Sequence, residues 1–369
     1  MELTPPPGLA AALASALAGR QVVAPVPQAP GEAVLAALRP DLPVTEASAG
    51  VVVTTSGSTG SPKAVVLSAE AILASAAATH RRLGGPGDWV CVLPTHHVAG
   101  MMTVARAVAA GRTAQLAASD LSDLPEPSQR TYLSVVGAQL YRAVAEPALL
   151  QRLRAYAAVL VGGSAVSPHL LRQVRDAGVR LVETYGMAET CGGCVYDGRP
   201  LDGVRPAVVD GRITISGPVV FSGYRLNPEL TSQVLDGDTV RTRDRGVITD
   251  GLLRITGRLD DVVISGGTNV DLAEAQRVVE ESFGPPEAGG PVLFAVPDSR
   301  WGHRVVAITT GETTLAELTE RLRPRLGAAA LPRELRRVAA VAYTPTGKID
   351  RPALQRAWQE PGEADGDRG

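Results

Sequence analysis

The sequence predicts an α/β protein, with a large N-terminal part of mostly parallel sheets and helices, a β-rich subdomain, and a small mobile α/β part at the C-terminal end. Strand-like apolar runs alternate with segments of helical spacing from residue 51 onward. Short strands with Asp-Gly turns follow residue 205, and a second alternation of helices and strands follows residue 260. The chain has 369 residues, 45% of them hydrophobic, which allows more than one core.

The N-terminal 47 residues are rich in alanine and leucine and are predicted as helical pieces broken by prolines. A β-branched run at 51–53 is predicted as a buried strand that enters a loop. The elements predicted next are a helix at 69–83, a strand at 89–94, a helix at 100–111, a strand-to-helix passage at 131–145, a strand at 157–163, a helix at 167–178 and a strand at 179–186. Ligands of such sheets bind at the carboxyl ends of strands, where Gly57, Gly163 and Gly186 are expected.

The pattern changes in the second half of the chain. Short strands are predicted within 207–217 and 251–258, followed by a helix at 271–283, strands at 291–296 and 303–310, and a helix at 313–326. We therefore predict an N-terminal domain at 1–259, a mobile C-terminal domain at 260–358 and a disordered polar tail at 359–369.

Composition excludes several classes of function. A net charge of −2 gives no general attraction to nucleic acid or anionic membranes, and 4% aromatic residues are too few for stacking on single strands. No apolar run is long enough to span a membrane, and the N-terminus has an acid and prolines where a secretory signal has basic residues. A cytoplasmic protein is expected. The sequence leaves a homo-oligomer open.

Three cysteines argue against a disulfide framework. Cys191 and Cys194 have the spacing of a redox pair in "CGGC", but no clear helix follows and no second pair is present for zinc. Two small residues that line a loop are the favoured interpretation.

The segment "TTSGSTGSPKA" at 54–64 combines hydroxyls, two glycines and a lysine, a composition that suits an anion. It does not match the P-loop of nucleotide triphosphatases, because Pro62 stands where that pattern has a glycine. A plain Ser/Gly surface turn remains the alternative at this point. Lys63 and Lys348 are the only lysines among 36 basic residues, which singles them out as point charges for one ligand.

Taken in order, the loops of this chain resemble those of the adenylate-forming superfamily, which contains acyl-CoA synthetases, adenylation domains and luciferases. The resemblance covers about residues 50–355. The segments that carry it are "TTSGSTGSPKA", "LPTHHVAG" (93–100), "VGGSAVSP" (161–168), "ETYGMAET" (183–190), "TRDRG" (242–246), "GRLDDVVISGGTNV" (257–270) and "PTGKIDR" (345–351).

The resemblance implies an ATP site with Mg²⁺ as cofactor and CoA as co-substrate. The residues implied for phosphate, adenine and ribose are Thr55, Ser56, Gly57, Ser58, Thr59, Gly60, Lys63, Gly162, Gly163, Ser164, Tyr185, Gly186, Asp244 and Arg258. Glu189 is implied to carry Mg²⁺. Taken alone, Tyr185 suits a core aromatic, Glu189 a solvated loop acid and Asp244 an ordinary turn acid.

The resemblance also implies residues for the acid and for the thiol. His97 lies beside the acyl carboxylate, and Gly192 and Gly193 line the acyl pocket. Asp260 is the implied hinge about which the C-terminal domain rotates. Lys348 serves adenylation, and Gly266 and Gly267 wall the pantetheine tunnel; a plain tight turn is the alternative for these two glycines.

The chain departs from the usual family pattern at five positions: Ala64, Ala188, Arg243, Thr268 and Gln276. Ala188 removes a hydroxyl that other members offer to phosphate, and Arg243 replaces a glycine. These differences alter details of the site rather than the class.

Among short members, "LPTHHVAGMM" and "YGMAETCGGCVYDG" resemble o-succinylbenzoate–CoA ligases of menaquinone biosynthesis. The expected activity is an ATP-dependent acid–CoA ligase that releases AMP and pyrophosphate. The alternatives are a ligase for another aromatic or small acid, a stand-alone enzyme that loads a carrier protein, and a nucleotide-binding protein without catalysis. A second substrate carboxylate needs a cation or donors, for which Arg199 is one candidate.

Overall fold

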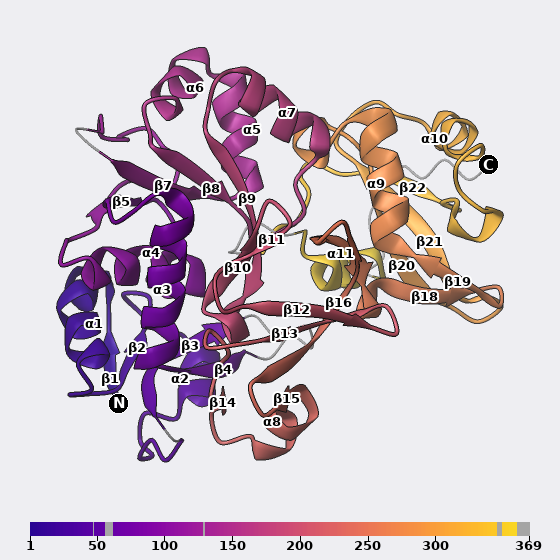
Figure 1. The fold of residues 1–369 in the computed structure, drawn as a ribbon. Helices are drawn as coiled ribbons and strands as arrows, with labels where there is room; N and C mark the ends of the chain where they lie inside the picture. The colour runs from indigo at the N-terminus through magenta and orange to yellow at the C-terminus, as the bar shows by residue number, and fades with distance from the viewer. Residues whose placement is uncertain (47, 56–61, 128–129, 345–348, 360–369) are drawn as a thin grey trace. The chain divides into compact units, whose positions relative to one another are not determined.

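The computed structural model describes residues 1–46, 48–55, 62–127, 130–344 and 349–359 (Figure 1). Contacts group the chain into two compact units. The first contains residues 1–242 and 248–254, and the second contains 243–247 and the residues from 255 onward. The predicted tail and the segment around Lys348 lie outside the described residues, apart from Gln359. The α/β fold class predicted from the sequence is confirmed.

The first unit contains two sheets with helices on their faces. One sheet has the order β1-β2-β3-β4-β14, with bounds Glu2–Thr4, Val23–Pro25, Ala49–Thr55, Lys63–Ser68 and Gly223–Tyr224. The other has the order β11-β10-β9-β8-β7-β5-β6, with bounds Arg199–Pro200, Gly192–Tyr196, Leu181–Met187, Ala158–Val161, Thr131–Val135, Asp88–Cys91 and Gln115–Leu116. Strands β6, β5, β7, β8 and β9 run parallel, as predicted, whereas β10 and β11 are antiparallel additions.

Alternation along the strands separates three apolar cores. Val51, Val53 and Leu67 face a central core that also receives Trp89 and Tyr132 from the other sheet. Helices α1 (Leu9–Leu17), α3 (Ala69–Leu83) and α4 (Val98–Ala109) fill this layer between the sheets (Figure 1). The opposite faces pack on α2 (Glu32–Leu38), and on α5 (Gly137–Ala145), α6 (Pro147–Leu153) and α7 (Pro168–Asp176). Strands buried on both faces explain the continuous apolar runs of the sequence.

The β-rich part of the chain is an antiparallel sheet, β12-β13-β16-β15, with β17 paired to β16 and α8 (Pro228–Val234) beside it. Its strands are Arg205–Val209, Arg212–Ser216, Thr239–Thr249, Leu235–Asp236 and Leu252–Arg258. Asp210 and Gly211 both have positive φ, as do Asp250 and Gly251. This geometry is that of type I′ turns, which Asp-Gly pairs favour, so the predicted turns are confirmed.

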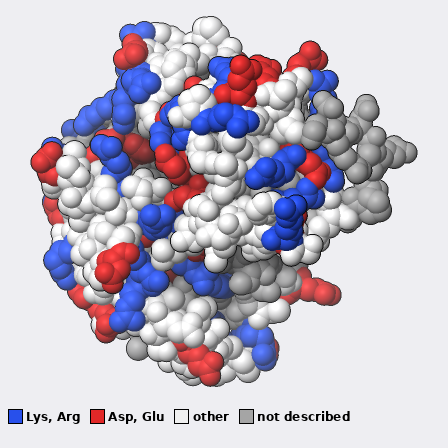
Figure 2. Space-filling view, turned by 90° about the vertical axis from the view of Figure 1, so that its right-hand side faces the viewer, with Lys and Arg blue, Asp and Glu red and all other residues white. Residues whose placement is uncertain are grey.

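The second unit has its own core under the sheet β19-β18-β21-β20, with β22 beside β21. The strands are Thr268–Asp271, Val262–Ser265, Gly302–Thr309, Val292–Asp298 and Leu335–Arg337, and the helices are α9 (Leu272–Phe283), α10 (Leu315–Leu322) and α11 (Arg351–Gln359). Asp271 begins α9 as N-cap, accepting hydrogen bonds from the backbone N–H groups of Ala273 and Glu274. On the face drawn in Figure 2, basic and acidic side chains are interspersed, in keeping with the small net charge.

The N-terminal prediction was partly wrong. Helices α1 and α2 are present, but the strands β1 and β2 were missed, as was β4 after the phosphate segment. β1 and β2 have three residues each, too few to show a periodicity in the sequence. Among the described residues, none of the helices is long and apolar enough to cross a membrane.

Candidate active site

The two ends of the predicted phosphate segment face each other across a hairpin. Thr55 ends β3, Lys63 begins β4, and the two residues are paired partners in the antiparallel register. Ser56, Gly57, Ser58, Thr59 and Gly60 lie outside the described residues. The fold thus holds Lys63 beside Thr55 at one end of the sheet.

Glu189 lies close to this end of the sheet, in the short helix η2 (Ala188–Thr190). The Oη atom of Tyr224 donates a hydrogen bond to Glu189 Oε1 at 2.7 Å. The Lys63 Nζ atom is 5.7 Å from the centre of the same tyrosine ring. The structure therefore brings the predicted phosphate lysine and the predicted magnesium ligand to one side chain, which sequence reasoning had missed.

A magnesium ion suits this donor set only together with a phosphate ligand. No group of three or more His, Cys, Asp or Glu side chains able to hold a metal occurs in the described part of the chain. Mg²⁺ is commonly bound by one or two carboxylates, waters and substrate phosphates rather than by an all-protein cage. One carboxylate, Glu189, beside one phosphate lysine, Lys63, fits that pattern.

His97 is the N-cap residue of α4, and its ring contacts the end of β3 through a hydrogen bond with the Thr54 backbone. Burial, helped by the neighbouring His96, lowers the pKa of His97 to about 4, so the ring is neutral at pH 7. Its Nε2 atom is buried and has no hydrogen-bond partner within the described residues. A buried polar atom of this kind is expected to meet a ligand or water.

The predicted adenine segment lies where β8 and β9 end. A Cβ atom on Gly162 would lie 2.4 Å from Thr184 Oγ1, and one on Gly186 would lie 1.9 Å from the Gly192 carbonyl oxygen. Both positions therefore require glycine for close approach of β8, β9 and β10. Gly163 and Ser164 are exposed after β8, and Tyr185 is half-buried against the central core.

The predicted acyl pocket borders α4. Gly192 has a positive φ, and a Cβ atom built there would lie 3.7 Å from Met102 and 4.0 Å from a terminal nitrogen of Arg106. Gly193 packs against Thr184 and Tyr196. Met102 and Arg106 were not among the predicted site residues.

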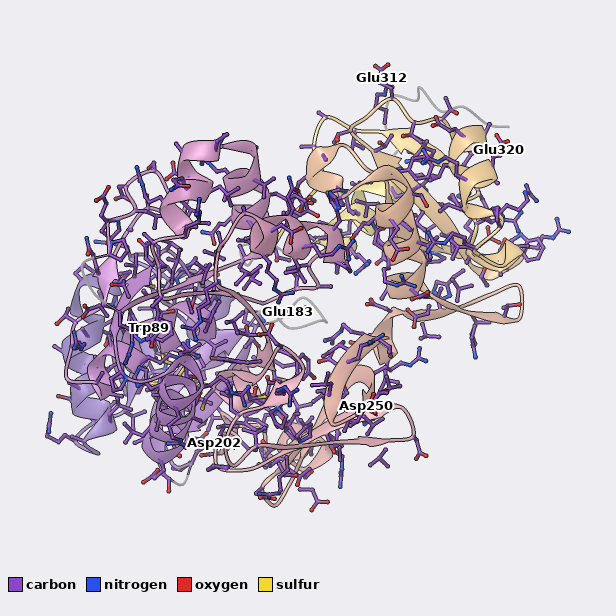
Figure 3. The ribbon with its side chains drawn as sticks, turned by 45° about the horizontal axis from the view of Figure 1, so that its top comes forward. Trp89, Glu183, Asp202, Asp250, Glu312 and Glu320 are labelled. Carbon is purple, nitrogen blue, oxygen red and sulfur yellow. The ribbon has the colours of Figure 1, made fainter. Side chains whose placement is uncertain are left out.

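Arg106 is a buried guanidinium within an apolar helix, 4% exposed. Its Cζ atom lies 5.1 Å from the centre of the Trp89 ring, on β5 in the packed interior of the first unit (Figure 3). It makes no ion pair with any described residue, and its Nε atom is buried without a hydrogen-bond partner among them. A lone charge in "VAGMMTVARAVA" was the sequence signal that could have identified it.

The cysteines of "CGGC" line the same region. Cys191 and Cys194 are buried and free. Burial raises the pKa of both thiols well above the usual value, which keeps them protonated and unreactive at neutral pH.

In the second unit, Asp244 accepts a hydrogen bond from Arg258 at 2.7 Å, and Arg258 also reaches Asp260 at 3.1 Å. Arg243, the departure noted above, lies 3.3 Å from the same Asp260 oxygen. The predicted ribose residues and the predicted hinge residue are thus linked by one chain of ion pairs.

The glycines predicted for the thiol tunnel form a two-residue turn between β18 and β19. Gly266 and Gly267 both have positive φ, and a Cβ atom on Gly266 would lie 2.6 Å from the Trp301 ring. Around Gly267 nothing lies within 4 Å of such a Cβ. The two glycines therefore form a tight turn, and the space beside Gly267 is open, so both interpretations of these glycines fit the structure. Lys348 lies outside the described residues, between Tyr343 and Ile349, which form a β-bridge.

Comparison with known proteins identifies one family and several named relatives. Residues 11–225 match the family described as AMP-binding enzyme. The chain is 40% identical over 353 residues to the "Probable 2-succinylbenzoate--CoA ligase" of Mycobacterium tuberculosis (strain CDC 1551 / Oshkosh), covering 90% of both chains. It is 32% identical over 283 residues to the "2-succinylbenzoate--CoA ligase" of Escherichia coli (strain K12), covering 74% of this chain and 61% of that relative.

Two solved structures share the fold. MenE of Bacillus subtilis in complex with the acyl-adenylate intermediate OSB-AMP aligns with a TM-score of 0.72 and 24% identity, covering 85% of this chain and 70% of that one. Wild-type E. coli MenE with a bound OSB-AMS analogue aligns with a TM-score of 0.65 and 28% identity, covering 85% and 70%.

Proposed function

Because the chain belongs to the AMP-binding enzyme family, we propose that it joins o-succinylbenzoate to CoA through an acyl-adenylate. The superfamily resemblance found in the sequence is confirmed by these relatives, and so is the enzyme class of acid–CoA ligase. Use of ATP, with CoA as the second substrate, follows from that class. The choice of acid, the role of Mg²⁺ and the roles of individual residues are proposals.

The observation that supports this acid is the buried, unpaired Arg106 beside Gly192. A charge this deeply buried is costly unless something compensates it. o-Succinylbenzoate carries two carboxylates: one reacts with ATP, and the other, on the ring, needs a cation. Arg106 lies beside Gly192, a residue predicted for the acyl pocket, and we assign it to the ring carboxylate. Arg199, the candidate from the sequence, is exposed in β11.

The chemistry then follows from charge. The reacting carboxylate attacks the α-phosphate of ATP and pyrophosphate leaves, after which the CoA thiol displaces AMP from the acyl carbon. Lys63 and the hydroxyl-rich segment bind the departing pyrophosphate, and Glu189 would hold a Mg²⁺ ion, which would stabilise phosphate charge. Lys348 neutralises the carboxylate and α-phosphate during the first step. The neutral His97 ring lies beside the acyl group, and its unpaired Nε2 is available to accept a hydrogen bond there, since the other ring nitrogen donates to the Thr54 backbone.

The test is pyrophosphate release from the full chain with three acids: o-succinylbenzoate, 4-oxo-4-phenylbutanoate, which lacks the ring carboxylate, and benzoate. We expect kcat/KM to favour o-succinylbenzoate over the analogue by about 100-fold or more, because the analogue leaves the buried charge unpaired. CoA must then be consumed with AMP formation. The Lys348→Ala variant serves as control: it should lose pyrophosphate release but still convert preformed acyl-AMP with CoA.

Other outcomes point to the alternatives. Equal use of the analogue would indicate a different acid, and acyl transfer only to a carrier protein would indicate a loading enzyme. Absence of pyrophosphate release with every acid would contradict ligase activity.

A further inference from the structure

Tyr224 connects two charged residues that the sequence assigned separately. It lies in β14, where it pairs with Val65 of β4, and it is only 7% exposed. Its hydroxyl donates to the Glu189 carboxylate at 2.7 Å, and its ring lies under the Lys63 ammonium at 5.7 Å. One side chain therefore contacts both charges at the phosphate end of the site.

The tyrosine is itself held by several contacts. Its backbone N–H donates to Thr231 Oγ1 at 2.9 Å, and that hydroxyl donates to the Asn227 carbonyl at 2.8 Å. Phe221 packs edge-on against its ring at 5.0 Å. The Phe221 backbone N–H in turn donates to the Glu189 carbonyl at 3.0 Å, which ties η2 to the same segment. These contacts tie Tyr224 and the Glu189 backbone to one packed segment.

These contacts have different physical effects on the two charges. A phenol that donates to a carboxylate makes a strong, charge-assisted hydrogen bond, which fixes one oxygen and leaves the other available to a cation. Groups that orient a metal ligand in this way commonly change metal affinity by about 10–100-fold when they are removed. The face of the ring attracts an ammonium group and limits the positions that the flexible lysine side chain adopts.

We propose that Tyr224 is a positioning residue of the ATP site, which orients Glu189 for Mg²⁺ through its hydroxyl and Lys63 for phosphate through its ring. The proposal rests on the proposed function, since it takes ATP and Mg²⁺ as ligands. The two halves of the proposal separate cleanly, because Tyr224→Phe removes only the hydroxyl and Tyr224→Leu removes the ring as well.

The experiment measures binding rather than turnover. ATP affinity is determined by calorimetry without metal and at increasing Mg²⁺, and Mn²⁺ binding to the ATP complex is followed by its paramagnetic resonance signal. Tyr224→Phe should raise the Mg²⁺ concentration for half-maximal effect about tenfold and leave metal-free ATP affinity within twofold of the wild type. Tyr224→Leu should also weaken metal-free ATP binding several-fold.

Tyr196→Phe is the matched control. It removes another buried tyrosine hydroxyl, one that lies 3.0 Å from Thr79 Oγ1. If Tyr224 were only structural, both phenylalanine variants would lower the melting temperature and leave the Mg²⁺ midpoint unchanged, which would overturn the proposal. A wild type that binds no ATP with or without Mg²⁺ would instead contradict the proposed function.

Discussion

Two buried arginines of the first unit differ in what surrounds them. The Arg225 side chain is fully buried and is paired with Glu46, and its guanidinium also donates to the carbonyls of Leu38, Arg39, Leu42 and Pro43. Arg106 is buried to a similar extent, but its guanidinium packs over the Trp89 ring and makes no ion pair with any described residue. The fold supplies the counter-charge of Arg225, whereas none of the described residues supplies one for Arg106.

This difference separates structural charges from ligand-binding ones. Arg225 joins the segment at 38–46 to the strand end after β14, so its contacts span distant parts of the sequence. Arg106 lies on a single helix beside the predicted acyl pocket. Replacing each arginine by methionine, which has similar length and no charge, should therefore give opposite results.

The largest effect is expected for Arg225→Met. It leaves the Glu46 carboxylate and several carbonyls without their donor, which should lower the free energy of unfolding by about 3–5 kcal/mol. Urea unfolding at pH 7.5 measures this change in the free energy of unfolding. Arg205→Met, which breaks an exposed 2.7 Å pair with Asp238, is the control and should cost less than about 1 kcal/mol. A similar loss of unfolding free energy in both variants would contradict the structural role of Arg225.

Arg106→Met should leave the free energy of unfolding within about 1 kcal/mol of the wild type, because no partner loses its charge. Its preference for o-succinylbenzoate over 4-oxo-4-phenylbutanoate should fall by about 100-fold in kcat/KM, or about 2.7 kcal/mol. Arg199→Met is the control and should keep the preference. If the Arg199→Met variant loses the preference for o-succinylbenzoate instead, the ring carboxylate binds near β11 rather than at Arg106.

Lys63 extends the comparison to a charge at the edge of the site. It has a ring partner but no ion pair with a described residue. Lys63→Met should raise the KM for ATP about 10–30-fold through loss of charge at the phosphates and leave AMP affinity near normal. Competition between AMP and a fluorescent nucleotide gives the second value. An equal loss of AMP and ATP affinity would place Lys63 away from the β- and γ-phosphates.

The smallest effect is expected at His97, whose folded-state pKa of about 4 is below the ordinary value of 6.5. Because the unfolded chain takes up the proton first, the contribution of this ring to stability is present above pH 6.5 and is lost as the pH falls toward 4. His97→Asn should reduce the stability loss between pH 7 and pH 5.5 by about 1 kcal/mol. Urea unfolding of both proteins at the two pH values tests this, and parallel curves would show that the ring titrates normally.

Much of the fold could be predicted because it follows local rules. The helix at 69–83 matches α3 residue for residue, and Ser167 caps α7 as expected. The missed strands β1 and β2 are set by pairing with strands farther along the chain, and β4 by antiparallel pairing with β3 across the phosphate segment, which short apolar runs do not reveal. The antiparallel turn of β10 onto β9 likewise depends on the contact of Gly186 with Gly192.

The site divides in a similar way. Lys63, Glu189 and Asp244 lie in loops with a recognisable order, so a resemblance could identify them. Arg106 and Tyr224 are buried partners of those loops, and their roles depend on which elements pack together. Neither helical spacing nor loop order shows that a tyrosine at 224 reaches a glutamate at 189.

The two-sided burial of β4 has a consequence for how the protein folds. Val65 and Leu67 enter one core while Ala64 and Val66 enter another, so both faces of the strand are apolar. A slip by one residue exchanges the two sets without exposing any of them, and hydrophobicity alone penalises it weakly. Lys63 is the residue that would be displaced. We therefore expect refolding to compete with a compact form of shifted register in which Lys63 is displaced. ATP binding, rather than secondary structure, would then measure the fraction of molecules that has reached the native pairing.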